Sequence, residues 1–259
     1  MYRSLEFASV SALEAVQGQI VVGGAFQYVI ANPSDRAWEL HTDKVSQGEL
    51  LTAQELAEIN AVRRNLVAAI TINGQQLTGF SPSIGDNNLG VDEIAQIRDV
   101  VSDGQGNIFV CGDWWVTAPT GNQFWQTFNS DAGESNPNNS SWEGQTSQHQ
   151  PRPNQHNVGK FNLTNGNSAI VGGQIWGATT DGGVQACDYE PETDTLIIGG
   201  HYDRIGPYDA NYVDTATPEN NYPAGHLALR KVNAIDAATG RLLEWDPGVT
   251  TFRLSLIHI

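Results

Sequence analysis

Tryptophan and amide side chains gather in one segment, residues 114–155, which reads WWVTAPTGNQFWQTFNSDAGESNPNNSSWEGQTSQHQPRPNQ. Flat aromatic rings can cover the C–H faces of a sugar, while Asn and Gln side chains hydrogen-bond its hydroxyls. This composition predicts a carbohydrate-contact surface that includes Trp115, Trp125 and Trp142. The same tryptophans could instead anchor a long loop that has no core of its own, and a protein is the alternative ligand.

Two histidines flank a second polar segment, residues 203–225. His201 ends one apolar strand pattern and His226 begins the next, with Asp203 close to the first. If a hairpin brings them together, two imidazoles and a carboxylate could bind a divalent metal. The alternative is that both are ordinary strand-end histidines bonded to backbone groups or water.

Oxygen ligands for a cation occur in the stretch DNNLGVDE, residues 86–93. Asp86, Asn88 and Asp92 carry the carboxylate and amide oxygens that Ca²⁺ prefers. The stretch lacks the full pattern of a calcium loop, so a plain polar turn is the alternative. The sequence indicates no other cofactor.

Motifs of catalysis do not stand out in this sequence. There is no nucleophile elbow, phosphate-cradling glycine loop or evident pair of catalytic carboxylates. The glycine pairs of VVGGAF and IVGGQIWG lie in strand patterns that no helical pattern follows, which argues against nucleotide binding. The sequence therefore favours a protein that is not an enzyme.

Charge and hydropathy argue against two further classes, nucleic-acid-binding proteins and membrane-spanning proteins. With 29 acidic and 13 basic residues the net charge is −16, which repels nucleic acid. No apolar run reaches the roughly 18 residues that a membrane-spanning helix needs.

The strand patterns that would position these side chains occur three times in the sequence. Strand patterns at 19–29, 107–116 and 195–206 each contain a glycine, Gly24, Gly112 and Gly200, spaced 88 residues apart in both steps. A shorter strand pattern precedes each one, at 9–16, 94–101 and 184–190. Downstream come two more strand patterns, joined by turns at Asn73-Gly74, Asn165-Gly166 and Thr239-Gly240, and such dipeptides favour hairpins.

Each unit therefore reads as a four-strand meander, A to D, over residues 9–82, 94–176 and 184–248. One such sheet cannot bury both faces, so neighbours must stack. We predict an all-β chain, a partial β-propeller of about three four-stranded antiparallel blades. Unrelated strands of a sandwich are the alternative. Because propellers need about four blades or more, residues 1–253 are expected to be an open arc whose partners include the remaining blades of a parent protein.

The B–C connections are the long ones, at 27–64, 115–156 and 203–225, whereas the A–B and C–D turns are short. In a meander the B–C connections share one face, so we expect the ligand there. The first connection contains a capping-box pair, Thr52 and Glu55, which predicts a short helix that covers this face as a lid. A helix that docks a partner is the alternative.

Residues 234–248, AIDAATGRLLEWDPG, together with 196–206, LIIGGHYDRIG, resemble the delta-60-type repeats of bacterial surface propellers. The resemblance covers most of the chain outside the insertions. It is poorest in the second unit, where Cys111 replaces a glycine and no Pro follows Trp176. It implies an exported or cell-surface protein, although no signal peptide opens the chain, and it implies no catalytic residues.

A related pattern keeps an enzyme as the alternative. Ala234, Asp236, Thr239, Gly240 and Trp245 nearly fit a quinoprotein repeat, but Trp245 comes one residue late. A quinoprotein-like or hydrolytic propeller enzyme is therefore the second hypothesis, and a purely architectural spacer is the third.

Two smaller features complete the sequence. Residues 254–259, LSLIHI, resemble a translated sequencing adapter, and we expect them to be a non-native tail. Cys111 stands where the other units have glycine, which predicts a small core position. Whether Cys111 pairs with Cys187 is left open.

Overall fold

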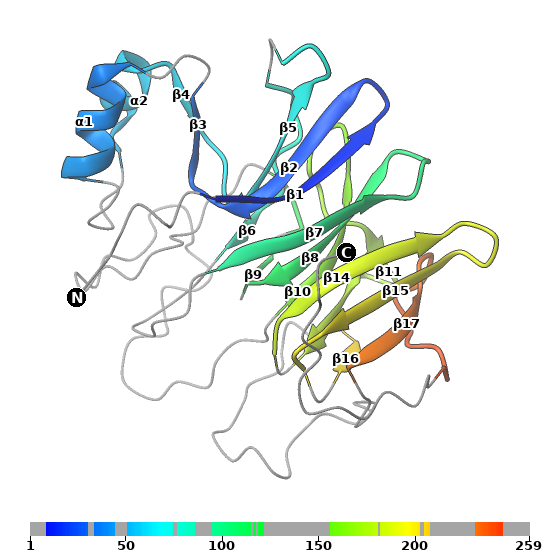
Figure 1. Ribbon diagram of the computed structural model, residues 1–259. Coiled ribbons are helices and arrows are strands. Elements are labelled where there is room, and N and C mark those ends of the chain that lie inside the picture. The colour runs from blue at the N-terminus through cyan, green and yellow to red at the C-terminus, as the bar shows by residue number, and fades with distance from the viewer. Residues whose placement is uncertain are drawn as a thin grey trace.

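The computed structural model of the protein describes residues 9–30, 34–44, 51–74, 77–85, 95–114, 116–117, 119–121, 156–180, 182–202, 205–207 and 231–245. Most of these residues form small antiparallel sheets, so the prediction of an all-β chain is confirmed. Three sheets of similar build lie side by side (Figure 1).

These sheets are named in chain order. The first sheet is β1 (Ser9–Val16), β2 (Gln19–Ala25) and β5 (Val67–Thr71). The middle sheet contains β7 (Gln96–Ser102), β8 (Asn107–Asp113) and β10 (His156–Asn162), extended by β13 (Gly177–Thr180) and β16 (Ile205–Pro207). The third sheet is β14 (Val184–Glu190), β15 (Thr195–Gly200) and β17 (Val232–Asp236). In each, the predicted strands A, B and C pair in that order.

The fourth predicted strand is not a full strand in the described residues. It is reduced to one isolated bridge per unit, Ile70 to Leu77, Phe161 to Ser168 and Ile235 to Leu242. The bridge lies seven residues after its partner in all three units, so the three C–D hairpins share one register. In the middle unit the chain then makes a hairpin of β11 (Ile170–Val171) and β12 (Gln174–Ile175) before β13 rejoins β10.

The C–D turns differ in one detail from the simplest Asn-Gly hairpin. Gly74, Gly166 and Gly240 adopt positive φ values of 69°, 73° and 75°, but the residue before each glycine does not. A single left-handed glycine after a tight turn is typical of loops longer than two residues. By contrast, both residues of the A–B turn of the first sheet, Gln17 and Gly18, have positive φ.

Apolar side chains fill the two spaces between the three sheets. One core cluster lies between the first and middle sheets and includes Val21, Ile108 and Phe161, all fully buried. The second lies between the middle and third sheets and includes Phe109 and Leu196. The middle sheet is therefore buried on both faces, which explains its dense run of apolar residues.

Short strands also link successive units. β6 (Ile84–Gly85), which follows the first unit, pairs with β9 (Val116–Thr117), which follows strand B of the second. In the same way β13 pairs with β16, which follows strand B of the third unit. The first residues of the second and third insertions are thus fixed beside the end of the preceding unit.

The first insertion forms a small unit with its own core. It contains β3 (Tyr28–Ile30), α1 (Asp35–Asp43), α2 (Ala53–Glu58) and β4 (Ala61–Arg63), and β3 pairs with β4. Leu40, Leu51 and Ile59 are buried against one another between these elements. The predicted capping box is confirmed, because Thr52 and Glu55 bond each other's backbone N–H groups at the start of α2. Helix α1 was missed, and the helices pack on β3 and β4 rather than as a lid on the three sheets (Figure 1).

The cap gives α2 a measurable acid sensitivity. Lys44 Nζ lies 2.6 Å from Glu55 Oε1, and this contact, with the hydrogen bonds from Thr52, lowers the pKa of Glu55 from 4.5 to about 2. Since the folded pKa is the lower one, the contact stabilises α2 fully above the ordinary value and loses that effect as the pH falls toward 2. We expect an NMR side-chain titration of Glu55 to show a midpoint near 2. Lys44→Met should raise it, and a midpoint at the ordinary value in the unaltered chain would contradict the contact.

None of the helices in the described part of the chain is long and apolar enough to span a membrane.

Candidate functional site

Most residues that the sequence singled out lie outside the described ranges. His201 is the exception. The residues outside the described ranges are Trp115, Trp125, Trp142, Asp86, Asn88, Asp92, Asp203 and His226. The sugar-contact and calcium hypotheses for these residues therefore stay predictions.

His201 is exposed directly after β15. Its Nδ1 atom lies 2.8 Å from Nε2 of Gln185, and its backbone N–H donates to the carbonyl of Gly183 at 2.9 Å. These are the contacts of a strand-end histidine. Within the described ranges, no group of three His, Cys, Asp or Glu side chains is placed to hold a metal ion.

The structure reveals a row of polar side chains that the sequence analysis did not find. Each strand A has a β-bulge near its start, which leaves Ser11, Arg98 and Gln185 as the extra residue. Arg98 Nε lies 3.4 Å from Oδ2 of Asp113, which ends strand B of the middle sheet. In the third sheet Gln185 contacts His201, which directly follows strand B, in the same way. Bulges commonly re-aim side chains in this way.

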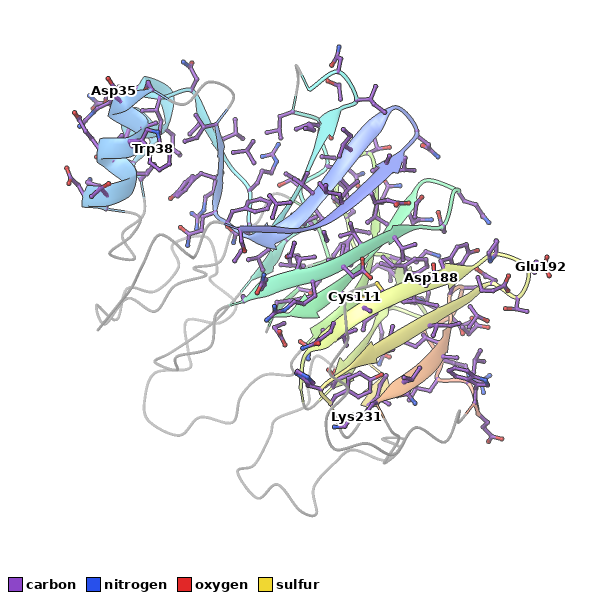
Figure 2. All side chains as sticks on the ribbon, viewed as in Figure 1. Asp35, Trp38, Cys111, Asp188, Glu192 and Lys231 are labelled. Atoms are coloured by element: carbon purple, nitrogen blue, oxygen red, sulfur yellow. The ribbon has the colours of Figure 1, made fainter. Side chains whose placement is uncertain are left out.

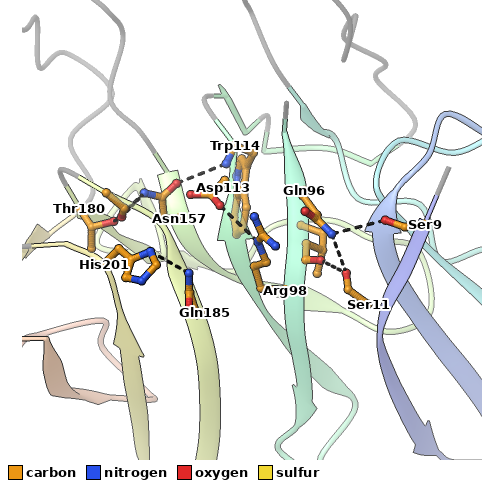
Figure 3. A network of polar contacts seen from close by, with 12 residues as sticks. Ser9, Ser11, Gln96, Arg98, Asp113, Trp114, Asn157, Thr180, Gln185 and His201 are labelled. Carbon is orange, nitrogen blue, oxygen red and sulfur yellow. Dashed lines mark hydrogen bonds and ion pairs between the residues drawn. The ribbon is translucent and has the colours of Figure 1, made fainter. Parts of the chain in front are cut away.

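The row continues from one sheet to the next (Figure 3). Ser11 Oγ donates to the carbonyl of Ile97 at 2.5 Å, and Gln96 Nε2 donates to Ser9 and Ser11 at 3.4 and 3.3 Å. We call the resulting set the polar rim. Its members are Ser9, Ser11, Gln96, Arg98, Asp113, Gln185 and His201.

The repeated glycine is explained by the same bulges. A Cβ atom on Gly24, Gly112 or Gly200 would overlap the backbone carbonyl oxygen of Ser9, Gln96 or Gly183, at or directly before the start of strand A. At these three glycines the crowding therefore comes from within the same sheet. At Gly23 it comes from the neighbouring sheet, since a Cβ there would meet the Ile97 side chain of the middle sheet. The equal 88-residue spacing of these glycines is the signal in the sequence that marks the three bulges.

Behind the rim, one tryptophan of the aromatic segment is a core anchor. Trp114 is 1% exposed, and its Nε1 donates to Thr117 Oγ1 at 2.9 Å. Its backbone N–H donates to Asn157, whose side chain also donates to Thr180 Oγ1 at 2.6 Å (Figure 3). The anchor interpretation therefore holds for Trp114 and leaves the three candidate tryptophans untested.

The chemistry of the rim is that of hydrogen bonding. The rim contains hydroxyl, amide and imidazole groups and one partly exposed ion pair. In this pair, the side chains of Arg98 and Asp113 are 40% and 35% exposed. Exposed pairs of this kind contribute little to stability, at most about 1 kcal/mol. Ser11, Arg98 and His201 are exposed, so their polar groups lie at the solvent-facing surface.

No family model and no curated protein matches this chain.

Proposed function

We propose that the chain is part of a β-propeller of an exported or cell-surface protein and serves as a non-catalytic binding module. Support comes from three sheets that repeat one strand order, one bulge position and one hairpin register. Stacked units of this kind present loops of equal position on one side.

The ligand face is the end of the sheets that bears the polar rim. The observation that carries this proposal is the repeated linkage of units, β6 with β9 and β13 with β16. Both pairs hold the chain that follows strand B, so the second and third insertions begin at one end, beside the rim. The A–B turns lie at the opposite end (Figure 1).

A glycan is the ligand class that best suits this face. Apart from the Arg98–Asp113 ion pair, the rim offers neutral donors and acceptors, and the insertion that starts at Trp115 contains further aromatic and amide groups. The net charge of −16 makes a polyanionic glycan a poor ligand, so we propose a neutral one.

A glycan array tests the proposal directly. We expect the chain to bind neutral glycans, and Trp125→Ala to weaken binding by about fivefold, because one lost ring stacking is worth on the order of 1 kcal/mol. Ile72→Ala is the control, since Ile72 is 62% exposed beside the C–D turn at the other end of the sheet. Absence of binding by the intact chain would reject glycan recognition. Equal loss in both variants would reject the face.

A further inference from the structure

The outer faces of the first and third sheets are not covered by another sheet in the described residues. We call the face that a sheet turns toward the preceding unit its leading face, and the opposite one its trailing face. The leading face of the first sheet consists of Leu13, Ala15, Ile20, Val22, Ala68 and Ile70. The trailing face of the third sheet consists of Ala186, Asp188, Ile197, Gly199, Val232 and Ala234.

The leading face of the first sheet repeats a face that is buried elsewhere in the chain. By strand register, Ile20 and Val22 correspond to Ile108 and Val110 of the middle sheet, which are fully buried. Ile20 and Val22 are only half-buried, and Leu13 is 67% exposed. Ala68 on this face is 0% exposed, but its larger apolar neighbours are only partly buried, whereas their counterparts lie fully buried under a neighbouring sheet. This difference marks a face suited to association.

The trailing face of the third sheet repeats the face that covers the middle sheet. Its residues match those of the first sheet position by position. Ala186, Asp188, Ile197, Gly199, Val232 and Ala234 correspond to Ala12, Glu14, Val21, Gly23, Val67 and Ala69. Four of the six pairs are identical residues, one pair differs only between Asp and Glu, and the last exchanges Ile for Val at an apolar position. This face should therefore accept a leading face like that of the middle sheet.

Carboxylates add polar complementarity to the apolar match. Glu14 accepts a hydrogen bond from the backbone N–H of Ser102 at 3.2 Å, and Asp99 accepts one from that of Cys187 at 2.9 Å. Each contact runs from a trailing face to strand A of the next sheet. Asp188 is the exposed counterpart of Glu14 (Figure 2). The backbone N–H of Ala15 is the counterpart of the Ser102 N–H that donates to Glu14.

We infer that two copies of this chain associate head to tail, with the trailing face of the third sheet of one copy on the leading face of the first sheet of the other. Such a heterologous contact uses two different faces, so each pair leaves one of each free to close a ring or extend. The net charge of −16 per chain opposes the association, and salt should strengthen it by screening. The inference rests on the stacking of the described sheets and needs no ligand on the rim.

The two native cysteines show which positions would meet. Cys111 is on the trailing face of the middle sheet and Cys187 on the leading face of the third, and their thiols hydrogen-bond each other. Gly199 corresponds to Cys111, and Leu13 corresponds to Cys187. Gly199 of one copy should therefore face Leu13 of the other. A Cβ on Gly199 has room, since its nearest neighbour would be 3.6 Å away.

Disulfide trapping tests the contact. Leu13→Cys and Gly199→Cys are made in separate chains in which Cys111 and Cys187 are replaced by Ala, and the two are mixed in 0.5 M salt (about the ionic strength that shortens screening to a few ångströms). Oxidised glutathione then takes two electrons and two protons from the thiols, forming the disulfide and two reduced glutathiones. We expect a shift from monomer to cross-linked dimer in the mixture and none with either variant alone.

The controls separate this contact from chance collision and from misfolding. Val62→Cys replaces Leu13→Cys in a matched mixture, because Val62 is 42% exposed but lies on β4, outside the first sheet. If circular dichroism shows that either variant is unfolded, Ala15→Cys with Asp188→Cys replaces the pair. A mixture that stays monomeric, or that cross-links no better than the control, overturns the inference and leaves a further sheet of a longer chain as the occupant. Glycan binding by the rim would be unaffected by that outcome.

Discussion

Gly200→Ala is expected to lower the free energy of unfolding by about 3 kcal/mol, the upper part of the range for overpacking that forces the backbone to move. The added Cβ would overlap the carbonyl oxygen of Gly183, which is backbone and cannot rotate away. The change would open the bulge that aims Gln185 at His201. Urea unfolding followed by tryptophan fluorescence measures the effect.

The adjacent glycine is a matched control in the same strand. Gly199→Ala places its Cβ no closer than 3.6 Å to any other atom, so we expect a change within about 1 kcal/mol of zero, in the stabilising direction. Similar losses from both substitutions would show that neither glycine is set by the bulge. Gly112→Ala should repeat the result of Gly200→Ala, because its Cβ would overlap the carbonyl of Gln96.

Ile108→Ala is expected to cost about 4 kcal/mol, within the range found for large-to-small changes at fully buried positions. Ile108 is 0% exposed between the first and middle sheets, where Val21 and Phe161 belong to the same cluster. The cavity would open in the middle of two stacked sheets that have little freedom to collapse. Thermal and urea unfolding of the variant would report the loss.

Ile20→Ala is the matched comparison, because Ile20 holds the corresponding position in the first sheet and is only half-buried. At low protein concentration we expect it to cost about 1 kcal/mol, close to the transfer free energy of the part of the side chain that is buried. If the head-to-tail contact forms, the cost should grow with protein concentration. An Ile20→Ala cost equal to that of Ile108→Ala in dilute solution would contradict the assignment of buried and open faces.

The cysteines show a second consequence of the stacking. Burial raises the pKa of the Cys111 thiol and raises that of Cys187 well above its ordinary value, so both are free thiols held in their unreactive form. The prediction that Cys111 fills a small core position is confirmed by its complete burial. Its contact with Cys187 could not be read from the sequence, because the two residues belong to different units.

The sequence by itself determined the strands and their turns. β1 and β14 have the predicted bounds, 9–16 and 184–190, and the predicted hairpin glycines have positive φ. These features are local: alternation of apolar residues and the freedom of glycine act within a few residues of chain. The reduction of the predicted D strands to single bridges, and helix α1, escaped prediction because strand pairing and helix packing depend on the neighbouring segments.

The tertiary structure alone decided which atoms meet between units. The hydrogen bonds of Ser9 and Ser11 with the middle sheet and the carboxylate contacts of Glu14 and Asp99 join residues that are 85 to 88 positions apart in the chain. A spacing of 88 residues shows that the units are alike, but it does not show which face of a strand its neighbour covers. That choice follows from how whole sheets stack, because each buries apolar area only when the next one lies against it.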